Sequence, residues 1–144
     1  MSSVRQEALI EGSLDQVWAL IGDPGRHPEW WPRVIEVRGT RFEQNELYRQ
    51  VTKMPLGTHE TTLMLERLDD LRAIRVRCLD TGTYADWRLT EAQSQTFVEA
   101  ELGMDPTGLG RRAFDAAVGT AYFRRWLQQS IDALKAAVED RSKT

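Results

Sequence analysis

The side chains in this sequence best suited to proton transfer are two histidines, His27 and His59. A histidine changes its charge near neutral pH because its reference pKa is about 6.5. His59 lies beside Glu60 in a predicted strand and is a candidate general acid or base, a role that also requires a partner within hydrogen-bonding reach. A solvated histidine near the end of a strand is the alternative. His27 comes directly before Pro28, and we expect it to be a turn residue.

Three tyrosines, Tyr48, Tyr84 and Tyr122, are candidates for holding a polar atom of a ligand. A buried tyrosine hydroxyl usually has a hydrogen-bond partner, so any of the three could orient a carbonyl or a phenol. A core aromatic residue whose hydroxyl is satisfied internally is the alternative for each. Tyr122 is the best placed of the three, so His59 and Tyr122 are the catalytic candidates.

Other kinds of chemistry have no matching pattern in the sequence. Two distant histidines and a single cysteine, Cys78, do not have the spacing of a metal site, and we predict neither a metal nor a cofactor. No Ser-His-Asp set, carboxylate pair or phosphate-cradling glycine loop is legible. Nucleic-acid binding is not expected, because the 144 residues carry a net charge of −3 without a basic patch.

Length and composition favour one ordinary globular domain over residues 1–144. A single cysteine allows no intrachain disulfide, which is typical of a reducing compartment. The N-terminal residues do not resemble a signal peptide, and no apolar run approaches the roughly 20 residues that span a bilayer. We therefore expect a cytoplasmic protein without a membrane span.

The N-terminal part of the chain carries its most distinctive residues on a helix and a loop. A strand is predicted over 4–11, followed by a helix that begins with an S-x-x-Q capping box at Ser13. The segment Asp23–Pro32 reads as a loop that contains three prolines and the adjacent Trp30 and Trp31. These tryptophans either line the mouth of a cavity, or one fills the core while the other lies on the surface.

Six further segments alternate between apolar and polar residues and are separated by turn residues, as in antiparallel strands joined by hairpins. We predict strands at 34–42, 47–54, 57–68, 72–79, 83–91 and 95–104. The strand at 47–54 fits either face, with Tyr48 on one and Val51 on the other. The later strands share an apolar face, formed by Leu63, Leu65, Ile74, Val76, Cys78, Ala85, Trp87, Leu89, Thr96, Val98, Ala100, Leu102 and Met104.

Arginines mark the opposite, solvated face of these strands. Arg75, Arg77 and Arg88 fall there by alternation, and we expect them to pair with Glu99 and Glu101 across strands. Such surface pairs contribute little to stability. A register shifted by one residue would turn Arg77 inward and make it a candidate for binding an anion.

One long helix is predicted over 109–140, a segment without proline. Its second half carries a regular core stripe, whereas its first half mixes small residues with aromatic ones such as Phe114 and Tyr122. Small residues leave room and aromatic residues provide walls, which is typical of a small-molecule pocket, here under residues 110–123. A tightly packed aromatic core would give a similar pattern. The core stripe consists of Leu127, Ile131, Leu134 and Val138.

In this order of elements the chain resembles the START-like (SRPBCC) superfamily and, within it, the polyketide cyclase/dehydrase and lipid-transport group. The resemblance covers essentially the whole chain. It implies an α+β helix-grip fold, in which a curved seven-stranded antiparallel sheet wraps around a long C-terminal helix and two short helices follow the first strand. The matching motifs are Ile10-Glu11-Gly12-Ser13, Val17-Trp18, Ile21-x-Asp23, Pro28-x-Trp30-x-Pro32, Trp87-x-Leu89-Thr90, Thr96-x-Val98 and Leu127-x3-Ile131-x2-Leu134-Lys135.

Members of this superfamily share a hydrophobic cavity between the sheet and the long helix but use it differently, so the fold alone does not name the function. The first hypothesis is that a monomer or homodimer binds one small hydrophobic ligand of lipid, polyketide or aromatic type. The second is an aromatase/cyclase or dehydratase acting on a polyketide-like chain, with His59 or Tyr122 assisting proton transfer. The third is a protein-interaction module without a ligand. The ligand-binding residues would be Trp30, Trp31, Trp87, Phe114, Val118 and Tyr122.

Overall fold

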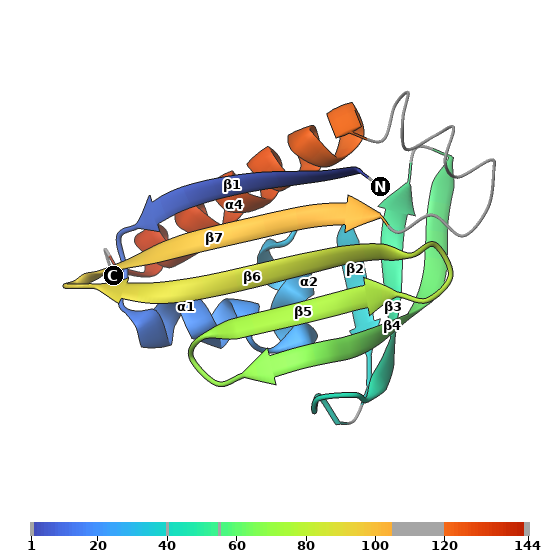
Figure 1. Ribbon diagram of the computed structural model, residues 1–144, viewed down its shortest axis with the longest axis horizontal. Helices are drawn as coiled ribbons and strands as arrows, with labels where there is room; N and C mark the ends of the chain where they lie inside the picture. Colours follow the sequence, from blue (N-terminus) through green and yellow to red (C-terminus); the bar gives the residue numbers. More distant parts are fainter. Residues whose placement is uncertain (1, 40, 55, 105–119, 143–144) are drawn as a thin grey trace.

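Seven antiparallel strands form a curved sheet in the order β1-β7-β6-β5-β4-β3-β2 (Figure 1). The computed structural model describes residues 2–39, 41–54, 56–104 and 120–142. The first and last strands of the chain pair with each other, which places β1 and β2 at opposite edges. The strands are β1 (Ser2–Ile10), β2 (Val34–Arg38), β3 (Leu47–Met54), β4 (Gly57–Asp69), β5 (Ala73–Cys78), β6 (Thr83–Ala92) and β7 (Gln95–Met104). The helices are α1 (Leu14–Ile21), the 3-10 helix η1 (Pro24–Arg26), α2 (His27–Trp30) and α4 (Thr120–Ser142).

The period-two pattern of the strands places the predicted apolar face in the core. The apolar residues predicted on that face of β4 to β7 are buried, and so is Thr96, whereas Thr61 and His59, which share this parity on β4, are half-buried and exposed, respectively. Strand β3, which fits either face by its sequence, buries the face of Tyr48, which pairs with Leu63, and Val51 on the other face is half-buried. The predicted strand at 34–42 is too long. Strand β2 ends at Arg38, and the chain beyond it turns so that Phe42 packs edge-on against Tyr48 at 5.6 Å.

Helix α1 begins as predicted, with a reciprocal capping box. The Ser13 hydroxyl accepts from the Gln16 backbone N–H at 3.2 Å, and the Gln16 side chain accepts from the Ser13 N–H at 2.8 Å. The prediction that Asp23–Pro32 forms only a loop is wrong, because the segment contains η1 and α2. Proline is compatible with the first positions of a helix, where its missing N–H would have no intrahelical partner. The two short helices implied by the family resemblance, α1 and α2, are therefore both present.

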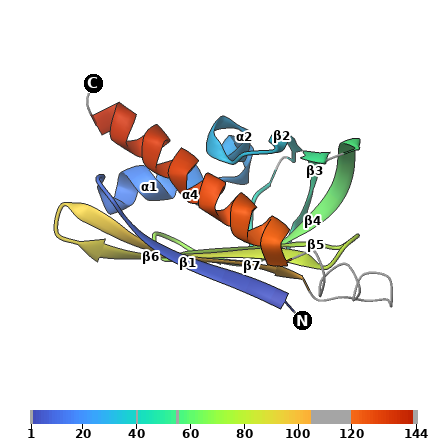
Figure 2. The same ribbon diagram turned by 90° about the horizontal axis from the view of Figure 1, so that it is seen from above.

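Helices α1, α2 and α4 all lie on the concave side of the sheet (Figure 2). Helix α4 runs obliquely across this face, and its predicted core stripe from Leu127 to Val138 is buried. The part of the long helix predicted before Thr120 lies outside the described residues. The described part of α4 packs mainly against β1 and β7, and it also contacts α2.

The junction between β1 and α1 has no space for a side chain at Gly12. A Cβ atom there would lie 2.3 Å from Cγ1 of Val138 on α4, and the Gly12 carbonyl accepts a hydrogen bond from the Thr96 hydroxyl at 2.9 Å. We expect Gly12→Ala to lower the free energy of unfolding by about 1–3 kcal/mol, as overpacking does in other cores. Urea denaturation measures this loss. The double variant Gly12→Ala/Val138→Ala lacks the methyl group that the new Cβ would contact. Its loss of stability should therefore be smaller than the sum of the losses of the two single variants. A loss equal to that sum would contradict this explanation.

The convex face carries the charged residues, but their pairing differs from the prediction. Arg75 contacts Glu66 at 3.1 Å and Asp86 at 3.0 Å, not Glu99 or Glu101. Similarly, Arg77 pairs with Glu66, and Arg88 pairs with Asp86. Long arginine side chains reach diagonal neighbours as easily as opposite ones, so alternation fixes the face and leaves the partner open. The register is not shifted, and Arg77 stays on the convex side.

Tyr84 also lies on the convex face, so its hydroxyl cannot contact a ligand on the concave side. Its hydroxyl donates to Glu101 at 2.6 Å. The guanidinium carbons of Arg75 and Arg77 lie 4.2 Å and 5.2 Å from the centre of its ring. Of the two interpretations of Tyr84, the structure supports the aromatic residue whose hydroxyl is satisfied internally, and not the one that orients a ligand.

Candidate functional site

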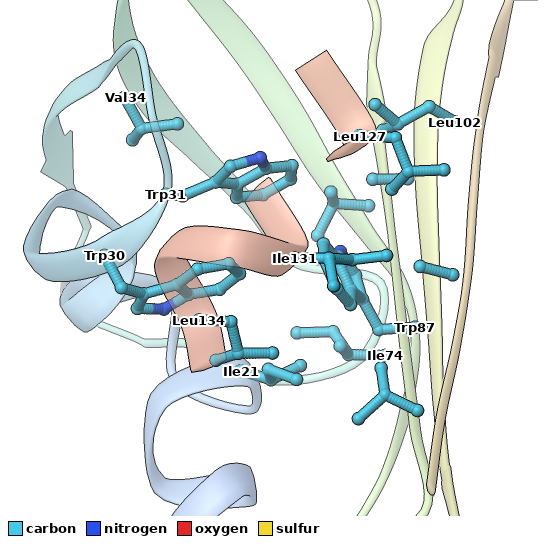
Figure 3. Packing of buried hydrophobic residues seen from close by; sticks show 14 of the residues in the cluster. Ile21, Trp30, Trp31, Val34, Ile74, Trp87, Leu102, Leu127, Ile131 and Leu134 are labelled. Atoms are coloured by element: carbon cyan, nitrogen blue, oxygen red, sulfur yellow. The ribbon is translucent and has the colours of Figure 1, made fainter. Parts of the chain in front are cut away.

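Four tryptophans meet at the centre of the concave side, and we call them the tryptophan cluster: Trp30, Trp31, Trp87 and Trp126. The rings of Trp30 and Trp31 are parallel, with centres 5.6 Å apart, and Trp126 of α4 stacks on Trp31 at 5.8 Å. Trp87 lies in the middle of β6, and its ring meets Trp30 and Trp31 edge-on, with ring centres 5.5 Å and 6.0 Å apart (Figure 3). Both Trp30 and Trp31 are buried, so the alternative with one of them on the surface is wrong.

Hydrogen bonds from two indoles fix the cluster to the backbone. Trp30 donates its N–H to the Leu20 carbonyl of α1 at 3.0 Å. Trp126 donates its N–H to the Pro32 carbonyl at 2.8 Å, which ties α4 to the link between α2 and β2. The tryptophan cluster therefore joins both short helices, the long helix and the sheet.

His27 is part of the support for this cluster. It is buried, with its ring edge-on to Trp30 at 5.7 Å and to Trp31 at 5.1 Å. Its Nε2 lies 2.9 Å from the Ile21 carbonyl, an acceptor, so Nε2 carries the proton in the neutral ring. Burial lowers the pKa of His27 to about 4, an effect larger than the opposing ones of the Ile21 carbonyl and of Asp23. The expectation of a simple turn residue missed this burial.

A second feature of the concave side is a polar strip on β3, formed by Tyr48, Gln50 and Thr52. Each is buried on the face that it shares with Leu63, and the Gln50 amide donates to the Thr52 hydroxyl at 3.0 Å. The strip ends where β2 begins, because Thr52 pairs with Val34. Sequence reasoning did not identify Gln50 and Thr52, although their spacing of two from Tyr48 is the signal that places them on its face.

Four buried polar atoms in this region have no hydrogen-bond partner among the residues that the structure describes. One is Nδ1 of His27, beside the tryptophan cluster, and the other three are the indole nitrogen of Trp31, the hydroxyl of Tyr48 and Oε1 of Gln50. Figure 3 shows the nitrogens of Trp30 and Trp31 on opposite sides of the stacked pair. Burial, with a smaller contribution from nearby Cys78, raises the pKa of Tyr48 well above its usual value. Tyr48 therefore stays protonated at neutral pH and can donate.

The link from α2 to β2 contacts α4 again through Arg33. This residue has a φ of +75°, and its carbonyl accepts from the Lys53 N–H at 2.7 Å. One guanidinium nitrogen donates to the Tyr122 hydroxyl at 3.4 Å, and the guanidinium carbon lies 5.1 Å from the centre of the Tyr122 ring. Tyr122 in turn contacts the ring of Trp126. Arg33 was not a candidate in the sequence.

The structure brings four of the predicted ligand-binding residues to one region: Trp30, Trp31, Trp87 and Tyr122. Tyr122 reaches the tryptophan cluster by its contact with Trp126. Phe114 and Val118 lie outside the described residues. The candidate acid or base His59 is exposed on β4, opposite Thr52 in the strand pairing. Its neighbour Glu60 pairs with Arg38 and Arg49. No described contact joins His59 to Tyr122.

The convex face carries a small hollow with a charged lining. It has a volume of about 150 Å³ and is lined by Arg5, Gln6, Glu7, Asp86, Arg88, Glu99, Ala100 and Glu101. Several of its charges neutralise one another, as Arg5 pairs with Glu101 and Arg88 with Asp86. In the described part of the chain, no three His, Cys, Asp or Glu side chains are grouped to hold a metal ion. Nor is any helix of that part long and apolar enough to cross a membrane.

Solved structures with the same architecture include the Zhui aromatase/cyclase from Streptomyces sp. R1128, with a TM-score of 0.76 and 17% identity over 98% of this chain and 95% of that one. A START superfamily protein from Mycobacterium smegmatis has a TM-score of 0.74 and 11% identity, covering 96% and 97% of the two chains. An AHSA1-like protein from Aeromonas hydrophila has a TM-score of 0.72 and 16% identity, covering 98% and 94%. At these identities the likeness shows the fold alone.

Sequence similarity identifies the family directly. Among proteins with curated descriptions, none matches the sequence significantly. The family described as polyketide cyclase/dehydrase and lipid transport matches residues 1–139 of the 144. Because this match covers nearly the whole chain, the chain belongs to the polyketide cyclase/dehydrase and lipid transport family.

Proposed function

We propose that the protein binds one small hydrophobic, ring-containing molecule on the concave side, between the tryptophan cluster and the polar strip. The observation that carries this proposal is that three buried polar atoms, on Trp31, Tyr48 and Gln50, have no partner in the described part of the chain. Buried polar groups in folded proteins are nearly always hydrogen-bonded. Each unsatisfied group costs about 1–3 kcal/mol, so a ligand that pairs with them would gain that energy on binding.

The three atoms define what the ligand must present to them. The Trp31 N–H can only donate, and Gln50 Oε1 can only accept. The Tyr48 hydroxyl, held protonated, donates as well. A phenol or enol group satisfies this set, because its oxygen accepts and its O–H donates. The rest of the ligand would be apolar, as is usual for pockets lined mainly by aromatic side chains.

Membership of the family supports the coarse class of ligand. We propose that Trp30, Trp87 and Tyr122 contact the apolar part, together with Phe114 and Val118. A catalytic use of the same site, of the aromatase/cyclase type, is the second candidate. It is favoured by the two donors, Trp31 and Tyr48, because donors aimed at a carbonyl oxygen stabilise the enolate that forms during ring closure. The described contacts of His59 do not place it in this role.

The direct test is native mass spectrometry of the purified protein, with calorimetric titration of 2-naphthol as a defined probe. We expect a co-purified small molecule or saturable binding of the probe at one site per chain. Absence of both would contradict the proposal. Incubation with a short aromatic-forming polyketide thioester, followed by product analysis, separates binding from turnover.

Tyr48→Phe provides a sharper test because stability and binding should change in opposite directions. Removing a buried hydroxyl that has no partner should leave the ligand-free protein as stable as before, or more stable by about 1 kcal/mol. The same change should weaken 2-naphthol binding by about tenfold. Urea denaturation and calorimetry measure the two effects.

Tyr84→Phe is the matched control, since it makes the same chemical change on the convex face. There the hydroxyl is bonded to Glu101 at 2.6 Å, so we expect a loss of about 1 kcal/mol in stability and unchanged binding. If Tyr48→Phe behaved like Tyr84→Phe in both measurements, Tyr48 would have no place in the binding site.

A further inference from the structure

Among the residues that the structure describes, Arg33 is a cation without a carboxylate partner, whereas most other arginines are paired. Nine arginines in the described part form ion pairs with Asp or Glu: Arg5, Arg26, Arg38, Arg41, Arg49, Arg67, Arg75, Arg77 and Arg88. Arg33 forms none with the residues that the structure describes, although it is half-buried. Among the described residues, the guanidinium of Arg33 makes one hydrogen bond, to the Tyr122 hydroxyl. Most of its five N–H donors are therefore unused.

The backbone holds Arg33 in a conformation that arginine rarely adopts. A φ of +75° lies in the left-handed region, which costs a residue with a side chain of the order of 1 kcal/mol or more. The Lys53 N–H bonds the Arg33 carbonyl and fixes the residue at the Thr52 end of the polar strip. Such strain is concentrated at functional sites, where it helps to position a side chain.

The neighbours of Arg33 orient its guanidinium toward the aromatic residues of α4. It lies over the ring of Tyr122, which packs against Trp126, and Trp126 stacks on Trp31. A ligand that accepts from the Trp31 N–H would therefore have the polar strip on β3 at one side and the guanidinium of Arg33 at another. The Tyr122 hydroxyl accepts from Arg33 and keeps its own proton, so it can donate to the same ligand oxygen.

We propose that Arg33 and Tyr122 bind a carboxylate, so that the ligand of this site is an amphipathic acid: an apolar ring system with a hydroxyl toward the polar strip and a carboxylate toward Arg33. This inference rests on the proposed function and specifies its ligand class. The planar guanidinium matches a carboxylate, and the single cation matches a single negative charge better than the higher charge of a phosphate. Tyr122 covers one face of the half-buried guanidinium, which shields such a pair from water on that side.

The competing explanation is that Arg33 is only a clamp between β2 and α4. A clamp would affect every ligand alike, because it acts through the position of Tyr122 and Trp126. Binding of a carboxylate would instead affect charged ligands and leave neutral ones unchanged. Two probes with the same rings separate these explanations: 6-hydroxy-2-naphthoic acid and its amide, 6-hydroxy-2-naphthamide.

The experiment titrates both probes into the wild type and into Arg33→Gln by calorimetry. We expect the wild type to bind the acid about tenfold more tightly than the amide, the value of one charge-assisted hydrogen bond. Arg33→Gln should remove that preference and leave the amide affinity within about twofold. Added sodium chloride should weaken binding of the acid to the wild type only, since salt screens the charge pair. Arg33→Lys keeps the charge without the planar fork and should keep part of the preference.

Arg72→Gln is the matched control, because it removes the same charge from the exposed turn between β4 and β5. It should leave both affinities unchanged. Equal weakening of both probes by Arg33→Gln would show a clamp and overturn the inference, and so would a wild type that binds the amide as well as the acid. In both cases the proposed function would stand, because the amide still binds. Failure of both probes to bind the wild type would instead contradict the proposed function itself.

Discussion

Trp87→Ala is expected to lower the free energy of unfolding by about 3–5 kcal/mol, the largest effect of any single substitution considered for this protein. Trp87 is 2% exposed and stands in the middle of the concave face. Its ring supports the edges of two other indoles, at 5.5 Å from Trp30 and 6.0 Å from Trp31. Alanine would leave a cavity beneath both of them. Because domains are typically stable by only 5–15 kcal/mol, such a loss is a large part of the total.

Urea denaturation followed by far-UV circular dichroism measures this loss, and near-UV circular dichroism reports the packing of the remaining indoles. Trp18→Ala is the matched control, since Trp18 is only half-buried on α1 and lies outside the tryptophan cluster. We expect its loss to be much smaller. Trp87→Phe keeps an aromatic edge and should fall between the two. Comparable losses for Trp87→Ala and Trp18→Ala would show that the cluster is not the centre of the core.

The same substitution should also abolish binding of 2-naphthol, because the position of Trp31 depends on Trp87 and on Trp126. Trp87→Phe therefore matters for the functional conclusion as well. If it folds and keeps the near-UV signal of the remaining indoles but does not bind the probe, Trp87 contacts the ligand directly. If it binds normally, Trp87 acts only as support for the other members of the cluster.

The central position of Trp87 could be predicted from the sequence because strand alternation encodes it directly. Side chains two residues apart share a face, so Ala85, Trp87 and Leu89 had to point the same way. The burial of Leu127 and Leu134 on α4 follows from helical spacing in the same manner. These are local rules, and they held wherever one face of an element was clearly more apolar than the other.

The residues that complete the candidate site follow from tertiary structure and were not predictable in this way. Arg33 lies beside Tyr122 because of a left-handed backbone conformation, and the sequence offers no glycine there to signal it. Gln50 is polar and would be assigned to solvent, yet it is buried beside Tyr48. The prolines near His27 suggested a loop, although proline also fits the first turn of a helix. In each case an interaction distant in sequence outweighed the local preference.

Protonation of His27 should make the stability of the protein depend on pH between about 4 and 6.5. The ring is buried and neutral, and burial lowers its pKa to about 4, whereas an unfolded chain has the ordinary value near 6.5. In this interval the unfolded state binds a proton that the folded state does not. Stability contributed by the neutral ring is therefore complete above pH 6.5 and is lost progressively as the pH falls toward 4. The total loss is up to about 3 kcal/mol, with no further loss from this group below pH 4.

Urea denaturation at several pH values, in the wild type and in His27→Gln, isolates this contribution. Carboxylates titrate in all variants, so the informative quantity is the difference in stability between the wild type and the variant. Glutamine can still donate to the Ile21 carbonyl but has no proton to gain, so its disadvantage should shrink as the pH falls from 6.5 to 4. A constant difference between His27→Gln and the wild type would mean that the folded protein takes up the His27 proton as readily as the unfolded chain does, and that burial does not lower its pKa.

Protonation of His27 should also affect the candidate site, because its ring packs edge-on against Trp30 and Trp31. A proton on Nδ1 would put a charge in this buried position, where no described residue offers that atom a partner. Displacing α2 to hydrate the ring would move Trp31 and loosen its stack on Trp126. We therefore expect the affinity for 2-naphthol, a probe whose own charge does not change in this range, to stay level in the wild type while the pH lies well above 4 and to fall as the pH passes through about 4, where the folded protein gains the proton on His27. In His27→Gln the affinity should stay level. Loss of affinity near pH 4 in the wild type alone would link binding to the position of α2.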